Sequence, residues 1–376
     1  AAASDGTGLS ILVGDTLYFA GVDSAASSVG AGLYAYTAGN NTAWLAADIN
    51  PPSNVNNTTP RGSKPGFYHG FRLIGDTIYF DGARGHHSPA VGGWQNAIFT
   101  PESSGLELFA YNPSNHTSWQ VTDIDNRSPQ FSSNGQLISS GNGLAPQCYQ
   151  LNVAAYVKNC SQNSMTVVGD TLFFAGRDSN SDIELWAHDT SNHSTWQVAN
   201  INTLPSTEVS NFCLSTSTAG FDYSSSAPGG FYTIGDTVYF TATNGFYSRE
   251  LWAYDTSNNS VWQVTRFYRC DDAGYNHFDG ENNFKIVGDE LFFIRDGGLY
   301  IHNDSTQYTK RLWTPNKHHR DAFSEWLTTG AVVVGDTLYG LRFSVSQPRF
   351  NYAPTDCPPT SLGGCLAPGS FLYAYD

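Results

Sequence analysis

The chain has 376 residues, of which 40% are hydrophobic and 14% aromatic, so it is long enough to bury a sizeable core. Charged residues make up only 14%, and the excess of acidic side chains gives a net charge of −15, which argues against binding to nucleic acid or to anionic membranes. No apolar run approaches the roughly 20 residues that a membrane-spanning helix needs.

The cysteines and the first residues favour an oxidising, extracellular compartment. The six cysteines are compatible with three disulfides, and none forms the Cys-x-x-Cys pair of a zinc or thioredoxin-like site. The chain starts AAASDG, which is typical of a mature N-terminus left after removal of a signal peptide. We therefore expect a secreted or cell-surface protein.

A hairpin motif recurs six times along the chain. The copies are VGDTLYFAG (13–21), IGDTIYFDG (74–82), VGDTLFFAG (168–176), IGDTVYFTA (234–242), VGDELFFIR (287–295) and VGDTLYGLR (334–342). Each copy predicts a short apolar strand, a two-residue Gly-Asp turn of type II′ and a second strand rich in β-formers. The repeat units begin near residues 11, 71, 166, 231, 284 and 331.

Two further strands are expected after each hairpin. The third strand is a Leu-aromatic segment, which reads GLYAY, ELFAY, ELWAH, ELWAY, GLYIH and FLYAY in the six units. In the first four units a polar turn and a tryptophan segment follow, whereas the fifth unit has the degenerate QYTKRLW. Each unit is therefore predicted as a four-stranded antiparallel meander, and no sustained helical period is present.

The third strand is apolar on both faces, because leucines alternate with aromatic residues along it. The leucines are Leu33, Leu108, Leu185, Leu251, Leu299 and Leu372, and the aromatic residues are Tyr34, Phe109, Trp186, Trp252, Tyr300 and Tyr373. Sheets covered on both sides predict an all-β, six-bladed β-propeller that forms a single domain over residues 1–376. An open solenoid is the alternative. The blade tryptophans and tyrosines are expected in the core.

The repeat resembles a known family. The ELW-x-x-D segment, the polar turn, W-x-V-x-D-I and V-G-D-T-L-Y-F are similar to the ELW-type, hyalin-like repeats of secreted microbial surface proteins. The likeness covers nearly the whole chain and is strongest in the second to fourth units. It departs in the turn, where DTSNHST or DTSNNSV replaces DGTxxGT. The resemblance implies an extracellular propeller in a surface or adhesion protein, and it implies no catalytic site.

The last unit is predicted to be incomplete, because the chain ends at FLYAYD without the polar turn and the tryptophan strand. Residues 1–9 could supply the missing strand, although they are poor in β-formers. A three-stranded last blade is a second alternative. We expect instead that a neighbouring subunit or a further segment occupies the open edge.

Topology sorts the turns and loops onto two faces of the predicted disc. The short Gly-Asp and polar turns lie on one face, and the long segments 50–70, 82–106, 125–165, 202–230 and 341–370 lie on the other. All cysteines fall in the long segments, and proximity predicts the pairs Cys148–Cys160, Cys357–Cys365 and Cys213–Cys270 among fifteen connectivities. Stapling of long loops is the simplest role for these bonds.

The sequence Asn-x-Ser/Thr, the acceptor of N-linked glycans, is frequent. It occurs at Asn40, Asn56, Asn57, Asn115, Asn126, Asn159, Asn192, Asn258 and Asn303. Four of these asparagines stand four residues before the tryptophan of their unit. Turn chemistry alone is the alternative, because asparagine tolerates the left-handed conformation. The acceptor and the hydroxyl persist while the residues around them vary, which favours glycosylation.

No catalytic motif is present, and the Asp-box of sialidase propellers is not matched, because Asp189 lies seven residues before Trp196 and the glycine is missing. A metal site is conceivable at two histidine pairs, His86 with His87 and His318 with His319, but adjacent histidines point apart and no carboxylate stands at ligand spacing, so none is predicted. No cofactor is predicted. Calcium bound by Asp271, Asp272, Asp279 and Glu281 is an alternative to a solvated acidic loop. Trp94 and Trp326 are candidates for exposed aromatic residues.

These features predict an extracellular, N-glycosylated structural or adhesive protein without enzymatic activity. We expect it to self-assemble into a fibre or layer, with copies of itself or other surface proteins as partners and covalent N-glycans on its surface. A carbohydrate-binding propeller that uses the long loops is the first alternative, and a glycan-active hydrolase with an unrecognised site is the second.

Overall fold

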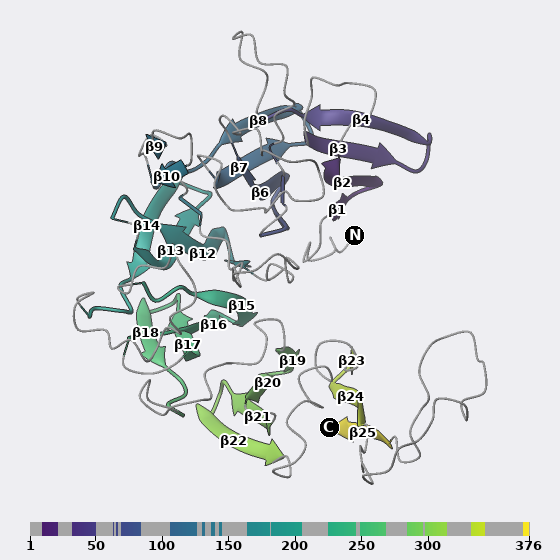
Figure 1. Ribbon diagram of the computed structural model, residues 1–376. Coiled ribbons are helices and arrows are strands. Elements are labelled where there is room, and N and C mark those ends of the chain that lie inside the picture. The colour runs from purple at the N-terminus through teal and green to yellow at the C-terminus, as the bar shows by residue number, and fades with distance from the viewer. Residues whose placement is uncertain are drawn as a thin grey trace, which may run out of the picture. The chain divides into compact units, whose positions relative to one another are not determined.

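The computed structural model is built from β-strands (Figure 1). It describes residues 10–21, 32–49, 63, 65–66, 69–83, 106–125, 130–131, 137–139, 143–144, 164–180, 182–204, 225–245, 249–267, 284–295, 298–313, 332–342 and 371–375. Within these ranges no residue is helical, so the predicted all-β class is confirmed. The chain divides into two compact units, residues 1–276 and residues 277–376.

The first unit contains four sheets of four strands, and each sheet is a simple antiparallel meander. The strands of the first sheet are β1 (Ser10–Val13), β2 (Thr16–Gly21), β3 (Gly32–Thr37) and β4 (Thr42–Ala47). Those of the second sheet are β5 (Phe71–Ile74), β6 (Thr77–Ala83), β7 (Leu106–Asn112) and β8 (Thr117–Gln120). The third sheet has β11 (Met165–Val168), β12 (Thr171–Arg177), β13 (Ile183–Asp189) and β14 (Ser194–Ala199). The fourth sheet has β15 (Gly229–Ile234), β16 (Thr237–Ala242), β17 (Glu250–Asp255) and β18 (Ser260–Gln263).

The second unit contains the last two repeats. Its first sheet has β19 (Lys285–Val287), β20 (Glu290–Arg295), β21 (Gly298–Asn303) and β22 (Tyr308–Trp313). Its second sheet has three described strands, β23 (Val332–Val334), β24 (Thr337–Arg342) and β25 (Phe371–Tyr375). The degenerate fifth tryptophan segment is therefore a strand. Closure of the six sheets into a ring stays a prediction, as does a single domain over the whole chain.

The Gly-Asp turns adopt the predicted conformation. The glycines have positive φ values of 55–60°, and they are Gly14, Gly75, Gly169, Gly235, Gly288 and Gly335. The aspartates that follow them do not have positive φ, which fits a type II′ turn and excludes type I′. An added Cβ would meet nothing within 4 Å at these glycines, so backbone conformation rather than space demands glycine here.

Both faces of the third strand are covered in the second and third sheets, as the sequence predicts. In β13, Leu185 is fully buried in the cluster that the third sheet shares with the fourth, while Trp186 packs against the cluster shared with the second sheet. A further cluster joins the first and second sheets, and another joins the two sheets of the second unit. Within each unit, neighbouring sheets thus bury the faces that they share.

Two features differ from the sequence-based expectation. A small sheet of β9 (Gln130–Phe131) and β10 (Leu137–Ser139) lies in the insertion between the second and third repeats. In addition, Trp119 and Trp196 are each 37% exposed, so the expectation that the blade tryptophans lie in the core was wrong for these two. They lie on the fourth strand of their sheets, which is an edge strand.

Candidate functional site

Many of the sequence-predicted site residues lie outside the described residues. These are Asn56, Asn57, Asn126, Asn159, the six cysteines, the two histidine pairs, the acidic loop at 270–282, Trp94 and Trp326. The described candidates are the asparagines of five hairpin loops, namely Asn40, Asn115, Asn192, Asn258 and Asn303. Besides them, the structure contains two sets of buried polar residues that the sequence analysis did not single out.

Four of the hairpin loops share one turn geometry. In each, the asparagine Oδ1 accepts the backbone N–H of the Ser or Thr two residues later, at distances of 2.9–3.2 Å. The residue between them has a positive φ of 53–59°, and these residues are Asn41, His116, His193 and Asn259. This is the asparagine turn chemistry that the sequence analysis held as its alternative to glycosylation.

The third strand holds the turn in place. Tyr36 and Tyr254 donate their hydroxyls to the amide oxygens of Asn41 and Asn259, at 3.0 Å and 2.7 Å. The hydroxyl of Tyr111 contacts Nδ1 of His116 at 2.9 Å. These bonds tie the left-handed residue to the strand, so the loop is a rigid part of the hairpin.

The loops of the third and fourth sheets also fix the atom that would carry a sugar. Nδ2 of Asn192 donates to Oδ2 of Asp189 at 2.7 Å, and Asn258 makes the same bond to Asp255. One Nδ2 hydrogen remains for substitution. The fifth loop is different, because Asn303 is half-buried at the end of β21 and its Oδ1 accepts both bonds from Thr306.

A glutamate is buried at the start of the third strand in three sheets. In the fourth sheet, Thr265 donates its hydroxyl to Oε2 of Glu250 at 2.6 Å and accepts the N–H of Leu251 at 3.0 Å. Oε1 of Glu250 accepts the N–H of Phe267 at 3.0 Å. Glu107 and Thr122 repeat the arrangement in the second sheet, with a hydroxyl-to-Oε2 distance of 2.7 Å.

The third sheet uses a different hydroxyl for the same purpose, because alanine occupies the position of the threonine. Ser226 donates both its hydroxyl and its N–H to the carboxyl group of Glu184. The N–H of Ile201 donates to Oε2 of Glu184 at 2.9 Å.

Burial also changes the acidity of these glutamates. It raises the pKa of Glu184 to about 8 and that of Glu107 to about 7. These groups hold the chain that leaves each sheet against its third strand.

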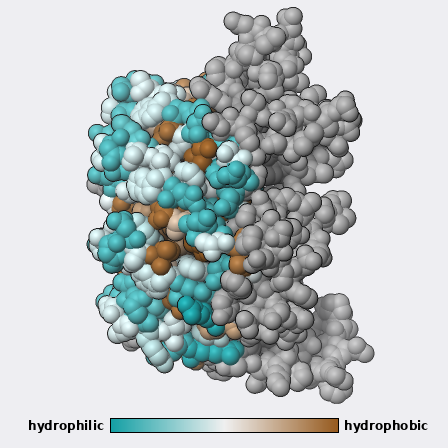
Figure 2. All heavy atoms as spheres, turned by 90° about the vertical axis from the view of Figure 1, so that its left-hand side faces the viewer, coloured by the Kyte–Doolittle hydropathy of each residue, from teal (hydrophilic) through white to brown (hydrophobic). Residues whose placement is uncertain are grey.

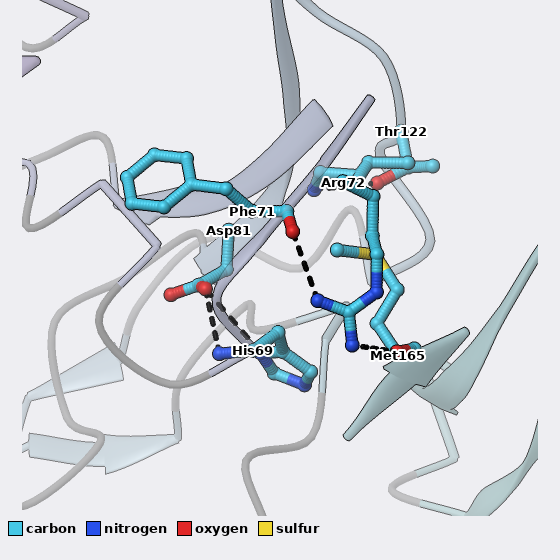
Figure 3. Close-up of polar contacts among 7 residues, drawn as sticks. His69, Phe71, Arg72, Asp81, Thr122 and Met165 are labelled. Atoms are coloured by element: carbon cyan, nitrogen blue, oxygen red, sulfur yellow. Dashed lines mark hydrogen bonds and ion pairs between the residues drawn. The ribbon is translucent and has the colours of Figure 1, made fainter. Parts of the chain in front are cut away.

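A second buried polar set lies in the second sheet (Figure 3). The N–H of His69 donates to Oδ1 of Asp81 at 2.7 Å, and the His69 ring nitrogen Nδ1 lies 3.7 Å from the same oxygen. Arg72 donates to the carbonyls of Phe71 and Met165, which links β5 to β11 of the third sheet. His69 and Asp81 are 0% exposed, so this pair cannot reach a substrate in the described conformation.

The described part of the chain holds no group of three His, Cys, Asp or Glu side chains close enough together to bind a metal ion. Likewise, no helix there is long and apolar enough to cross a bilayer. The calcium site and the disulfides predicted from the sequence stay predictions.

No family model matches the chain, and no curated protein matches it. Among solved structures, the chain is similar to TolB from Acinetobacter baumannii, with 12% identity, a TM-score of 0.32 and coverage of 87% of this chain and 60% of TolB. An oligogalacturonate lyase in complex with manganese gives 10% identity, a TM-score of 0.40 and coverage of 87% and 70%. A prolyl endopeptidase gives 11% identity and a TM-score of 0.40, with coverage of 89% of this chain and 38% of the endopeptidase. At these identities and TM-scores, none of them assigns an activity, substrate or metal to this chain.

The prediction that the chain has no enzymatic activity was wrong as an inference from its repeats. The similar solved structures include a lyase and a prolyl endopeptidase, so this kind of all-β fold also carries enzymes. The physical reason is that activity depends on a few side chains placed on the scaffold, and a missing sequence motif does not exclude them. The ELW-type resemblance stays an interpretation of the repeats.

Proposed function

We propose that this chain is an extracellular, N-glycosylated structural or adhesive protein built as a six-bladed propeller. The observation that carries the proposal is an exposed asparagine in the same loop of four successive sheets. These residues are Asn40, Asn115, Asn192 and Asn258. Loops on a rigid sheet scaffold are suitable places for groups that face the surroundings.

The hydroxyl residues of these loops favour glycosylation over turn chemistry alone. In the first two loops, the hydroxyls of Thr42 and Thr117 bond the asparagine Oδ1 at 2.6 Å, so the turn itself uses them. In the third and fourth loops, Ser194 and Ser260 donate only their backbone N–H to the asparagine. The turn therefore does not require a hydroxyl there, whereas a glycosylation acceptor does.

Occupancy of the asparagines tests this function directly. Protein from its natural source is treated with an amidase that releases N-glycans in heavy-oxygen water, which converts each occupied asparagine to a labelled aspartate. We expect label at Asn40, Asn115, Asn192 and Asn258, and less at Asn303, because its loop differs and it is half-buried. Peptide mapping by mass spectrometry reads the label. Four unlabelled asparagines would refute the proposal.

We further propose that the chain self-assembles at the edge of its last sheet. Strand β25 has the Leu-aromatic pattern of β17, which β18 covers in the fourth sheet. Among the described residues, no strand pairs with the second side of β25. Such an edge presents unpaired N–H and C=O groups, and it favours addition of a strand from a second copy.

Assembly through β25 predicts oligomers that a strand-mimicking peptide breaks. Sedimentation velocity over a range of concentrations is expected to show species larger than the monomer. A peptide with the sequence of residues 259–265 imitates the fourth strand and is expected to shift the distribution toward monomer, while a scrambled peptide is not. A chain that remains monomeric at every concentration would count against assembly without affecting glycosylation.

A further inference from the structure

Two tryptophans of the outer strands keep an exposed surface close to a candidate glycosylation asparagine. Trp119 and Trp196 follow Asn115 and Asn192 by four residues, and each is 37% exposed. The face shown in Figure 2 is mostly hydrophilic or weakly polar, with small apolar patches among its described residues. Covering a large aromatic ring that is partly exposed to water on such a surface is energetically favourable.

The strand register places each tryptophan on the face from which the asparagine loop is anchored. In the third sheet, Trp196 pairs with Ala187 and Ser194 pairs with Asp189. Paired residues, and residues two apart along a strand, point to the same face of a sheet. The side chains of Trp196 and Asp189 therefore share one face. The second sheet repeats the arrangement, because Trp119 pairs with Ala110 and Thr117 pairs with Asn112.

In the third sheet, the atom that would carry the sugar is held on the same face. Nδ2 of Asn192 donates to Oδ2 of Asp189 at 2.7 Å, so it lies against a side chain that points to the tryptophan side. Two residues of a strand rise about 7 Å, which sets the separation between the level of Asp189 and that of Trp196. Nδ2 of Asn192 therefore lies close to the level of Asp189, about 7 Å along the strand from the level of Trp196.

We propose that the innermost sugars of the N-glycans on Asn115 and Asn192 pack against the exposed surfaces of Trp119 and Trp196. This inference rests on the proposed function, because it needs both asparagines to be glycosylated. One face of a pyranose ring presents C–H groups, which suit the negative face of an indole. A tethered sugar is present at an effective concentration of about millimolar or more, so it outcompetes free sugars and other chains for this surface.

The test removes one glycan and reads both tryptophans. Ser194→Ala abolishes the acceptor sequence at Asn192 but keeps the backbone N–H that the asparagine accepts. Ser194→Thr keeps the acceptor sequence and is the matched control. Hydroxyl-radical footprinting of the secreted proteins, read by mass spectrometry, is expected to show oxidation of Trp196 rising about twofold or more in Ser194→Ala, because its covered face returns to water. Trp119 is expected to be unchanged, and neither tryptophan changes in Ser194→Thr.

Thr117→Ala and Thr117→Ser give the mirror experiment, in which only Trp119 is expected to respond. Intact glycopeptides measured on the same samples separate this inference from the function on which it rests. Glycosylated Asn192 with equal Trp196 oxidation in the wild type and in Ser194→Ala would overturn the packing and leave the glycoprotein function standing. Absence of glycan from both asparagines in the wild type would overturn both.

Discussion

Replacement of Glu250 by alanine is expected to lower the free energy of unfolding by about 2–5 kcal/mol, because each buried donor that loses its acceptor costs about 1–3 kcal/mol. Glu250 is 0% exposed and accepts bonds from the hydroxyl of Thr265 and the N–H of Phe267. The truncation also leaves a cavity, because the Glu250 side chain is fully buried. Denaturant unfolding followed by tryptophan fluorescence and by far-UV circular dichroism measures the loss.

Two further variants show that the effect arises from the hydrogen bonds. Glu250→Gln keeps the shape and one acceptor oxygen, so it is expected to lose less stability than Glu250→Ala. Thr265→Val removes the hydroxyl partner, and the double variant Glu250→Ala/Thr265→Val is expected to cost less than the two single changes added together, because the pair acts as one unit. An alanine variant as stable as the wild type, or strict additivity in the double variant, would contradict a structural role for this pair.

The repeated part of the fold was predictable because the local signals agree with one another. The Gly-Asp turn fixes where the first two strands meet, and the φ of Gly14 has the sign that the turn type requires. Alternation of Leu185 and Trp186 fixed the burial of both faces of the third strand. Where such signals repeat, as in the first five units, strand order followed directly from the sequence.

The buried glutamates could have been found from the sequence but were missed. Glu107 and Thr122 are separated by fifteen residues, and so are Glu250 and Thr265, which is a signal visible in two units. The third unit obscures it, because its glutamate uses Ser226, which lies forty-two residues away. The third strand was interpreted through its leucine and aromatic residues, whose periodicity is plain, and no prediction was made for the glutamate that precedes them.

The exposed tryptophans and the small β9–β10 sheet could not have been predicted from the repeat. Four outer-strand tryptophans occupy equivalent positions in the first four units, yet Trp44 and Trp262 are half-buried whereas Trp119 and Trp196 are exposed. The repeat itself therefore carries no signal that separates the two pairs. The short strands β9 and β10 lie in the long segment between the second and third repeats, outside the repeated motifs, so periodicity gave no signal for them.

The protein is expected to be more stable near pH 6.5 than near pH 8.5, by about 1–2 kcal/mol. Burial raises the pKa of Glu184 to about 8 and that of Glu107 to about 7, whereas an unfolded glutamate titrates near 4.5. Between these values the folded chain binds protons that the unfolded chain does not. The resulting stability is fully present below about pH 4.5, and it is lost as the pH rises through 7 and 8. Thermal unfolding at a series of pH values measures it.

The comparison is made above pH 6.5 because buried histidines act in the opposite direction below it. Burial lowers the pKa of His188 to about 4, so its contribution is fully present above 6.5 and is lost as the pH falls through 4. Burial lowers the pKa of His302 as well.

The variant Glu184→Gln cannot ionise at this position, so it is expected to flatten the decline in stability between pH 6.5 and 8.5. Relief of the net charge of −15 on acidification would remain in both proteins. An equal decline in the variant and the wild type would show that general charge repulsion, and not the buried carboxyl group, governs the pH dependence.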